Sequence, residues 1–156
     1  MALTPQVTVT QILSPTSATA KLISYLGTDV AANTEFSETV PAGKLWTLLS
    51  VTVSLVQGIT DVPQPQLVID DGTNVLYQGY CSTIAQVVST TCQYTWVSGG
   101  PPAAALVGAT TNVAAVCGFG SPMTLGAGYR IRSNTIAKGA NSNYGAPAFL
   151  VVETTL

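Results

Sequence analysis

The sequence predicts a single all-β domain, a β-sandwich of jelly-roll type with about eight to ten strands and an extended N-terminal arm. Three observations favour this fold. β-branched residues recur in runs of alternating polarity, Gly, Pro and turn dipeptides interrupt those runs roughly every ten residues, and no segment sustains a helical apolar stripe. A chain of 156 residues can bury one sizeable core. We therefore divide it into residues 1–13, an arm or first strand, and residues 14–156, the sandwich domain.

The segment before the Ser14-Pro15 break alternates apolar and polar residues, as an edge strand does. We predict that this arm adds a strand to a neighbouring molecule, with Leu3, Val7 and Val9 as its contact residues. The alternative is that the segment is the first internal strand, because terminal strands commonly pair within their own sheet.

Residues 18–26 and 35–40 are the next predicted strands, and the longest one follows the Pro41-Ala42-Gly43 turn and continues to Leu55. In its second half, alternate apolar residues from Leu49 to Leu55 share one face, whereas Trp46 and Leu48 fall on the other. This change of face predicts a bulge or a covered strand end. We also expect Trp46 to be largely buried, since it opens the most apolar strand.

A tight hairpin is predicted at residues 66–77, where Asp70-Asp71-Gly72 separates two strands, because Asp-Gly tolerates the positive φ that hairpin turns require. Further strands are expected at 84–97, 103–119, 125–133 and 148–153. Segments 40–46 and 125–131 share an Ala-Gly turn followed by a strand. Paired Greek keys of a jelly roll would place these turns at equivalent corners.

The composition indicates an association-prone surface. Only 8% of the residues are charged, against about 25% in ordinary soluble domains, and 47% are hydrophobic. Few charges remain to keep a monomer dispersed, so we expect a homo-oligomer. The five basic residues are scattered singly and the net charge is −2, which argues against a nucleic-acid partner.

The sequence lacks the residues of most catalytic sites. There is no histidine, which removes the commonest general base and the commonest metal ligand. A glycosidase would need two facing carboxylates, and the candidates are Asp61, Asp70, Asp71, Glu35 and Glu38. Asp70 and Asp71 are adjacent in a turn, where Asp is favoured for backbone reasons, and no calcium-loop or phosphate-loop pattern occurs. We predict no enzyme activity, no metal and no cofactor.

The three cysteines, Cys81, Cys92 and Cys117, are odd in number and lack metal-ligand spacing, so we expect buried free thiols and no structural disulfide. No signal peptide or membrane-spanning apolar stretch is evident. Two Trp and six Tyr are spread singly along the strands, which favours core or interface packing over a sugar-binding platform.

Segments 40–51, 68–72, 125–133 and 149–153 together resemble small β-sandwich head proteins of tailed bacteriophages, in particular the capsid decoration, or cement, proteins. The resemblance covers residues 40–153. It implies a non-enzymatic virion protein that binds the major capsid protein on the outer capsid surface, often as a homotrimer, after synthesis in the host cytoplasm. The predicted arm would then contact a neighbouring subunit or the capsid lattice.

Other functions fit the same architecture, because fold does not determine function. A head-fibre protein, a tail receptor-binding or carbohydrate-binding module and a minor jelly-roll capsid protein are the alternatives. Exposed Trp and Tyr on one concave face would favour carbohydrate binding, and two carboxylates across a cleft would favour a glycosidase.

Overall fold

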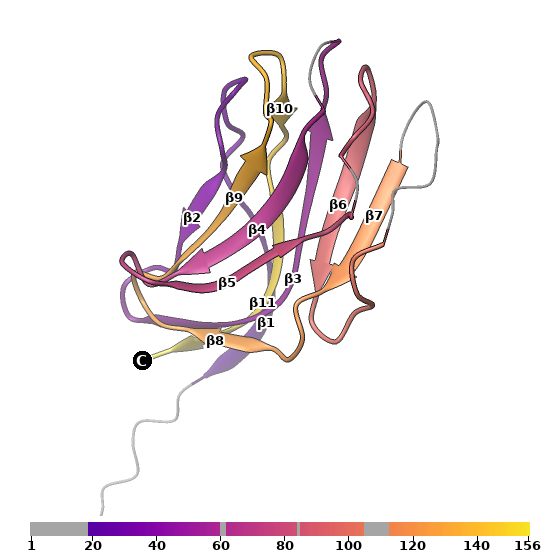
Figure 1. Cartoon of the computed structure of the whole chain (residues 1–156). Helices are drawn as coiled ribbons and strands as arrows, with labels where there is room; N and C mark the ends of the chain where they lie inside the picture. The colour runs from indigo at the N-terminus through magenta and orange to yellow at the C-terminus, as the bar shows by residue number, and fades with distance from the viewer. Residues whose placement is uncertain (1–18, 60–61, 84, 105–112) are drawn as a thin grey trace, which may run out of the picture.

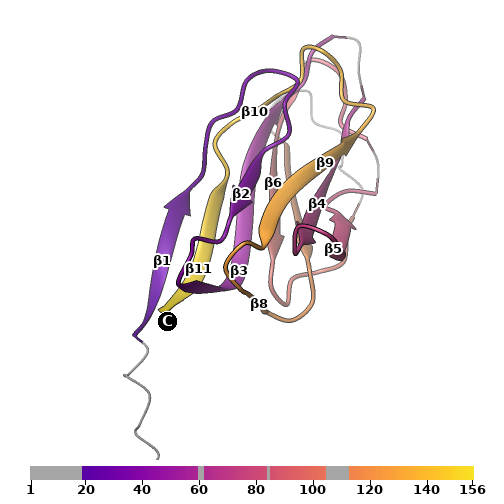
Figure 2. The same cartoon turned by 90° about the vertical axis from the view of Figure 1, so that its left-hand side faces the viewer.

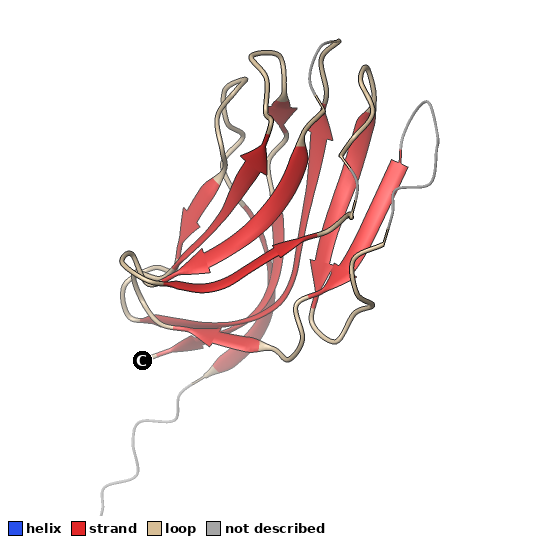
Figure 3. Ribbon diagram, viewed as in Figure 1, coloured by secondary structure: helices blue, strands red, loops and turns tan. Residues whose placement is uncertain are grey.

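The computed structural model describes residues 19–59, 62–83, 85–104 and 113–156, which form two packed β-sheets (Figures 1 and 3). The larger sheet has the order β1 (Ala20–Leu26), β11 (Ala148–Thr155), β3 (Lys44–Val56), β6 (Thr91–Val97), β7 (Val113–Gly118), with β8 (Met123–Leu125) and β10 (Asn143–Tyr144) also paired to β3. The smaller sheet has the order β2 (Ser37–Thr39), β9 (Arg130–Ile136), β4 (Gln64–Asp70), β5 (Val75–Tyr80).

The predicted all-β sandwich is confirmed, since the described residues contain strands and no helix. The strand count was slightly underestimated, because the described residues form eleven strands. The excess comes from strands of two or three residues, such as β8 and β10, which pair with β3. Such short pieces carry no alternation that a sequence pattern can detect.

Strand pairing follows a regular order along the chain. Apart from β7, β8 and β10, the strands pair antiparallel as first with last, second with second-last and so inward: β1 with β11, β2 with β9, β3 with β6, and β4 with β5. The β11·β3 and β9·β4 pairings then complete the two sheets. Figure 2 shows the sheets face to face, with β1 at the margin of the larger one.

The core lies between the sheets and is rich in aromatic residues. Trp46 is 1% exposed, which confirms the predicted burial, and its ring lies 6.4 Å from that of Phe149. Tyr94 and Trp96 on β6 stack with ring centroids 6.0 Å apart. Full burial of such side chains supplies most of the favourable free energy of folding.

The predicted bulge lies in β3 at Leu49. β11 residues Leu150 and Val151 pair with Ser50 and Leu48, so Leu49 has no partner between them. The extra residue reverses the alternation, and as a result both halves of β3 point their apolar side chains into the core: Trp46 and Leu48 before the bulge, and Val51, Val53 and Leu55 after it.

The predicted hairpin turn is also confirmed. The β4–β5 hairpin turns at Gly72, whose φ is 92°, as the Asp-Gly signal requires. The two similar Ala-Gly turns lie side by side, because the Val40 amide donates to the Tyr129 carbonyl at 2.9 Å and the Gly128 amide donates to the Val40 carbonyl at 3.0 Å.

The predicted strand over 84–97 is wrong in its first half, since only β6 (91–97) is a strand there. Residues 85–90 form a loop with Ser89 at a φ of 56°. The loop is held by the buried Gln86, whose side-chain amide donates to the Leu55 and Thr90 carbonyls and accepts from the Tyr94 hydroxyl. This buried amide replaces the ladder bonds that a strand would have made.

Other predicted strands match β1, β2, β7, β9 and β11 in position. The predicted arm, with Leu3, Val7 and Val9, and the boundary at residues 13 and 14 lie outside the described residues, as does most of the first half of the 103–119 segment.

Candidate functional site

The outer face of the larger sheet carries no charged side chain on its strands. The charged residues of these strands are Lys21, Lys44 and Glu153. They lie on the inward face of the sheet together with the buried Trp46, because Lys21 pairs with Glu153 and Glu153 pairs with Trp46. The outward positions hold aliphatic and small polar residues, chiefly Leu22, Ser24, Leu26, Ser50, Thr52, Thr95, Val97, Ala114, Val116, Leu150 and Val152. We call this surface the uncharged face.

Aliphatic side chains on the uncharged face are accessible to solvent. Leu22 is 65% exposed, Leu26 68% and Val116 47%. Some of the intervening hydroxyls bond to one another, with Thr52 Oγ1 3.1 Å from Thr95 Oγ1 and Thr47 Oγ1 3.2 Å from Thr124 Oγ1. These mutual bonds reduce the cost of removing the face from water.

The outer face of the smaller sheet differs in carrying charged and amide side chains beside exposed aliphatic ones such as Ile136. Asp70 on β4 is nearly buried, and its two oxygens accept from Arg130 Nε and Arg132 Nε on β9, each at 2.7 Å. Burial alone would raise the pKa of Asp70, but hydrogen bonds from Arg132, Arg130 and the Gly72 amide outweigh it and lower the pKa. The three side chains form one ion network with a net charge of +1.

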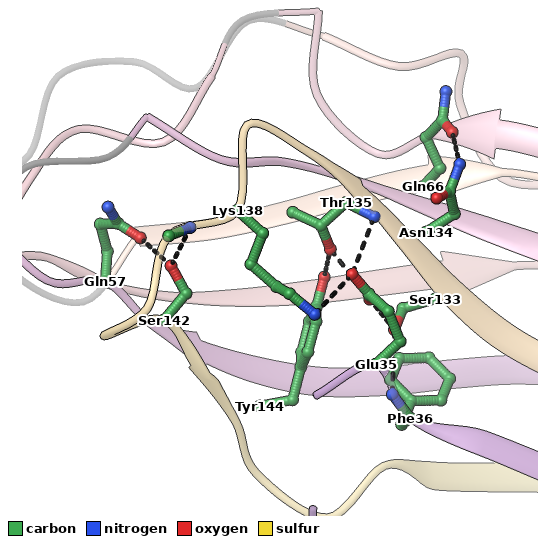
Figure 4. A network of polar contacts seen from close by, with 11 residues as sticks. Glu35, Phe36, Gln57, Gln66, Ser133, Asn134, Thr135, Lys138, Ser142 and Tyr144 are labelled. Atoms are coloured by element: carbon green, nitrogen blue, oxygen red, sulfur yellow. Dashed lines mark hydrogen bonds and ion pairs between the residues drawn. The ribbon is translucent and has the colours of Figure 1, made fainter. Parts of the chain in front are cut away.

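An amide cluster continues this polar face along the same strands. Gln66 Oε1 accepts from Gln78 Nε2 at 2.7 Å and from Asn134 Nδ2 at 2.9 Å, the latter visible in Figure 4. Gln66 is buried, so the two donors satisfy its carbonyl oxygen in place of water. We call the Arg130–Asp70–Arg132 network and this cluster together the polar face.

Glu35, one of the candidate carboxylates, lies at one end of the sandwich within a network of donors (Figure 4). Its oxygens accept from the hydroxyls of Ser133 and Thr135 and from the Thr135 amide, and Lys138 Nζ lies 2.8 Å away. The Thr135 hydroxyl also contacts the buried Tyr144 hydroxyl. The network ties the segment before β2 to β9 and to the loop after it, which is a structural arrangement.

The candidate carboxylates Glu38 and Asp71 are also engaged by nearby donors. Glu38 accepts from the Tyr25 hydroxyl at 3.3 Å and from the Thr28 amide at 2.5 Å. Asp71 accepts from the Asn74 and Thr73 amides, and these bonds lower its pKa. A general acid needs a raised pKa, so the lowered pKa values of Asp70 and Asp71 are the reverse of that requirement. Asp61 lies outside the described residues.

In the described part of the chain, no group of three or more His, Cys, Asp or Glu side chains gathers in a way that suits a metal ion. The predicted burial of the three cysteines is confirmed. Cys81 Sγ lies 3.1 Å from the Ala115 carbonyl, and the contact with Cys81 together with burial raises the pKa of Cys117. A protonated, buried thiol such as Cys117 is a poor nucleophile, whereas the hydrogen bond with Cys117 lowers the pKa of Cys81. Within the described residues no helix has the length and apolarity to span a membrane.

The aromatic residues are mainly core residues, as predicted. Trp46, Trp96, Tyr94 and Tyr144 are all essentially inaccessible. A sugar-binding platform therefore lacks both tryptophans, the residues best suited to stack on a sugar ring.

No protein family model matches the chain, and no curated protein matches it in sequence. The chemistry of its surfaces is therefore the basis for a function.

Proposed function

We propose that this chain is a non-enzymatic structural protein of a bacteriophage particle, which binds the outer surface of an assembled capsid and stabilises it. The observation that supports this function best is the uncharged face, a surface of aliphatic and hydroxyl side chains without charges on its strands. Contiguous exposed apolar surface on a soluble protein commonly marks a binding site for another protein.

The uncharged face suits protein association for an energetic reason. The cores of protein interfaces are depleted in charged residues, because each buried charge that lacks a partner costs several kcal/mol. Strands β1, β11, β3, β6 and β7 present none on this side. Binding there removes aliphatic area from water at little polar cost.

The order of strand pairing supports the jelly-roll part of the prediction. The first strand pairs with the last, the second with the second-last, and so inward, as in one long antiparallel hairpin that is rolled into two sheets. The strand order β1-β11-β3-β6 then faces β2-β9-β4-β5. Jelly rolls are common in viral capsid proteins and in lectins, so this topology supports a virion protein without selecting its partner.

The partners in this proposal are the major capsid protein and further copies of the chain, with a homotrimer as the expected oligomer. Leu3, Val7 and Val9 of the N-terminal segment are proposed to contribute contacts to a neighbour or to the lattice. The protein would be made in the host cytoplasm and reside on the virion surface. No catalytic residue takes part.

The test is co-sedimentation of the purified protein with empty capsids assembled from the major capsid protein encoded in the same genome. Val116→Lys places a charge on the uncharged face, and Ile136→Lys is the matched control, because Ile136 is 48% exposed on the outer face of β9. We expect Val116→Lys to lower capsid binding at least tenfold and Ile136→Lys to bind like the wild type. Equal binding by both variants, or no binding by the wild type, would refute the proposal.

A further inference from the structure

Strand β1 is an unprotected edge of the larger sheet. Among the described strands it pairs only with β11, and six of its seven residues are exposed. Figure 2 shows it at the margin of the molecule, beside β11. Its backbone donors and acceptors on the far side therefore have no described strand as partner, which makes β1 a template for strand addition.

Most of the features that normally protect an edge strand are absent from β1, whose one such feature is Lys21. Its register with β11 runs over seven residue pairs without a bulge, and its sequence, Ala-Lys-Leu-Ile-Ser-Tyr-Leu, contains no proline and one charge. By contrast, β2, an edge of the smaller sheet, has only three residues. A long, regular and apolar edge is unusual for a strand that remains in water.

The sequence of β1 is complementary to itself. In an antiparallel pairing centred on Ser24, Leu22 of one copy lies opposite Leu26 of the partner subunit, and Ile23 lies opposite Tyr25 of the partner subunit. Lys21 then lies opposite Gly27 of the partner subunit, so like charges do not meet. A register centred on Ile23 instead places Leu22 opposite Ser24 and Lys21 opposite Tyr25, which leaves the leucines unmatched.

We propose that two copies of this chain pair through β1, antiparallel and about a two-fold axis at Ser24, so that their larger sheets become one continuous sheet. The contact adds cross-strand Leu–Leu pairs on the outer side, where Leu22 and Leu26 are 65% and 68% exposed, and joins the two uncharged faces edge to edge. It rests on the proposed function for the association of copies, and it gives a two-fold dimer in place of the homotrimer expected there.

The contact is of modest size. One strand pair and its flanking side chains fall below the roughly 1,200 Å² of a standard stable interface, so we expect a reversible dimer with a micromolar dissociation constant. Sedimentation velocity from about 1 to 500 µM covers that range of affinity. The observed mass should rise toward twice the 16.0 kDa of the monomer as concentration increases.

Cysteine cross-linking tests the register directly. Ser24→Cys places two thiols opposite each other across the axis, within the Cα separation of 4.4–6.8 Å that a disulfide spans, so mild oxidation with copper phenanthroline should yield a covalent dimer. Leu22→Cys is the matched control, because in this register it faces Leu26 of the partner subunit and not itself. The wild type controls for the native cysteines, which are buried.

Covalent dimer from Ser24→Cys alone supports the pairing. The pairing would be overturned by equal cross-linking of both variants or by no cross-linking of either. It would also be overturned by a stable trimer of three times 16.0 kDa that neither variant cross-links. Thermal unfolding of each variant confirms that it is folded. Capsid co-sedimentation separates the two proposals: a monomer that still binds capsids refutes only the β1 pairing, and a cross-linked dimer that does not bind them refutes only the proposed function.

Discussion

The two outer faces of the sandwich differ in the side chains that they present to solvent. On the polar face, Asp70 is enclosed by Arg130 and Arg132, and Gln66 by two amide donors, so the buried polar atoms are satisfied within the molecule. On the uncharged face, aliphatic side chains such as Leu22 and Val116 remain exposed. The contrast supports our proposal that a partner covers the uncharged face.

The largest expected effect comes from the core that supports both faces. Trp46→Ala removes a fully buried indole and its 3.0 Å hydrogen bond to Glu153, and should lower the free energy of unfolding by about 3–5 kcal/mol. Urea denaturation measures this loss. Trp46→Phe, which keeps most of the volume, should cost less, and an equal loss in both variants would show that the hydrogen bond and not packing dominates.

Gly118→Ala tests the margin of the uncharged face. A Cβ at Gly118 would clash with the Gly100 carbonyl oxygen, so two backbone segments must move apart, and we expect a loss of about 3 kcal/mol in the free energy of unfolding. Gly126→Ala is the control, since its nearest atom would be a Tyr129 ring carbon at 3.4 Å. Thermal unfolding compares them, and a Gly118→Ala protein as stable as the control would contradict the packing described.

Asp70 should make the polar face sensitive to acid. Its pKa is lowered in the folded protein, so its contribution to stability is present above its unfolded pKa of about 3.9 and is lost as pH falls through the lower folded value. Asp70→Asn should cost about 2 kcal/mol at pH 7, a figure reduced because the two arginines are partly exposed. Urea unfolding from pH 7 to pH 2 should show a smaller difference between the two proteins at the acid end.

The smallest effect is expected on the uncharged face. Thr52→Val or Thr95→Val alone leaves one hydroxyl without its 3.1 Å partner on a half-exposed surface and should cost under about 1 kcal/mol. The double variant should be close to the wild type in stability, because both partners become apolar and keep their shape. A large loss in the double variant would show that this face depends on its polar bonds as the polar face does.

Local structure was predictable where it depends on neighbours in sequence. Asp71-Gly72 predicted the hairpin, and the change of face at Leu49 predicted the bulge, because each feature depends on a few consecutive residues. The loop at 85–90 was missed, since it depends on hydrogen bonds from Gln86 to Leu55, which is 31 residues away.

The surfaces were predictable only in part. Low charge indicated an association-prone surface, but not that the charges of the larger sheet would all lie on its inward side. The Asp70 network depends on the pairing of β4 with β9, some 60 residues apart. A signal did exist, because Arg130 and Arg132 are two residues apart and must share a face of any strand. The alternation of residues along a strand predicts the face of the sheet on which a side chain lies, but it does not predict which strand lies beside that strand.

The position of β11 has a consequence for the order of folding. It is translated after every other described strand, yet it lies within the larger sheet, hydrogen-bonded to β1 on one side and β3 on the other. During synthesis, 121 residues follow the end of β1, and 91 follow the end of β3, before their shared neighbour begins. Pairings at such separation fold slowly, typically in milliseconds to seconds, and leave unpaired edges exposed meanwhile. We therefore expect a chaperone to bind the nascent chain more than the folded protein.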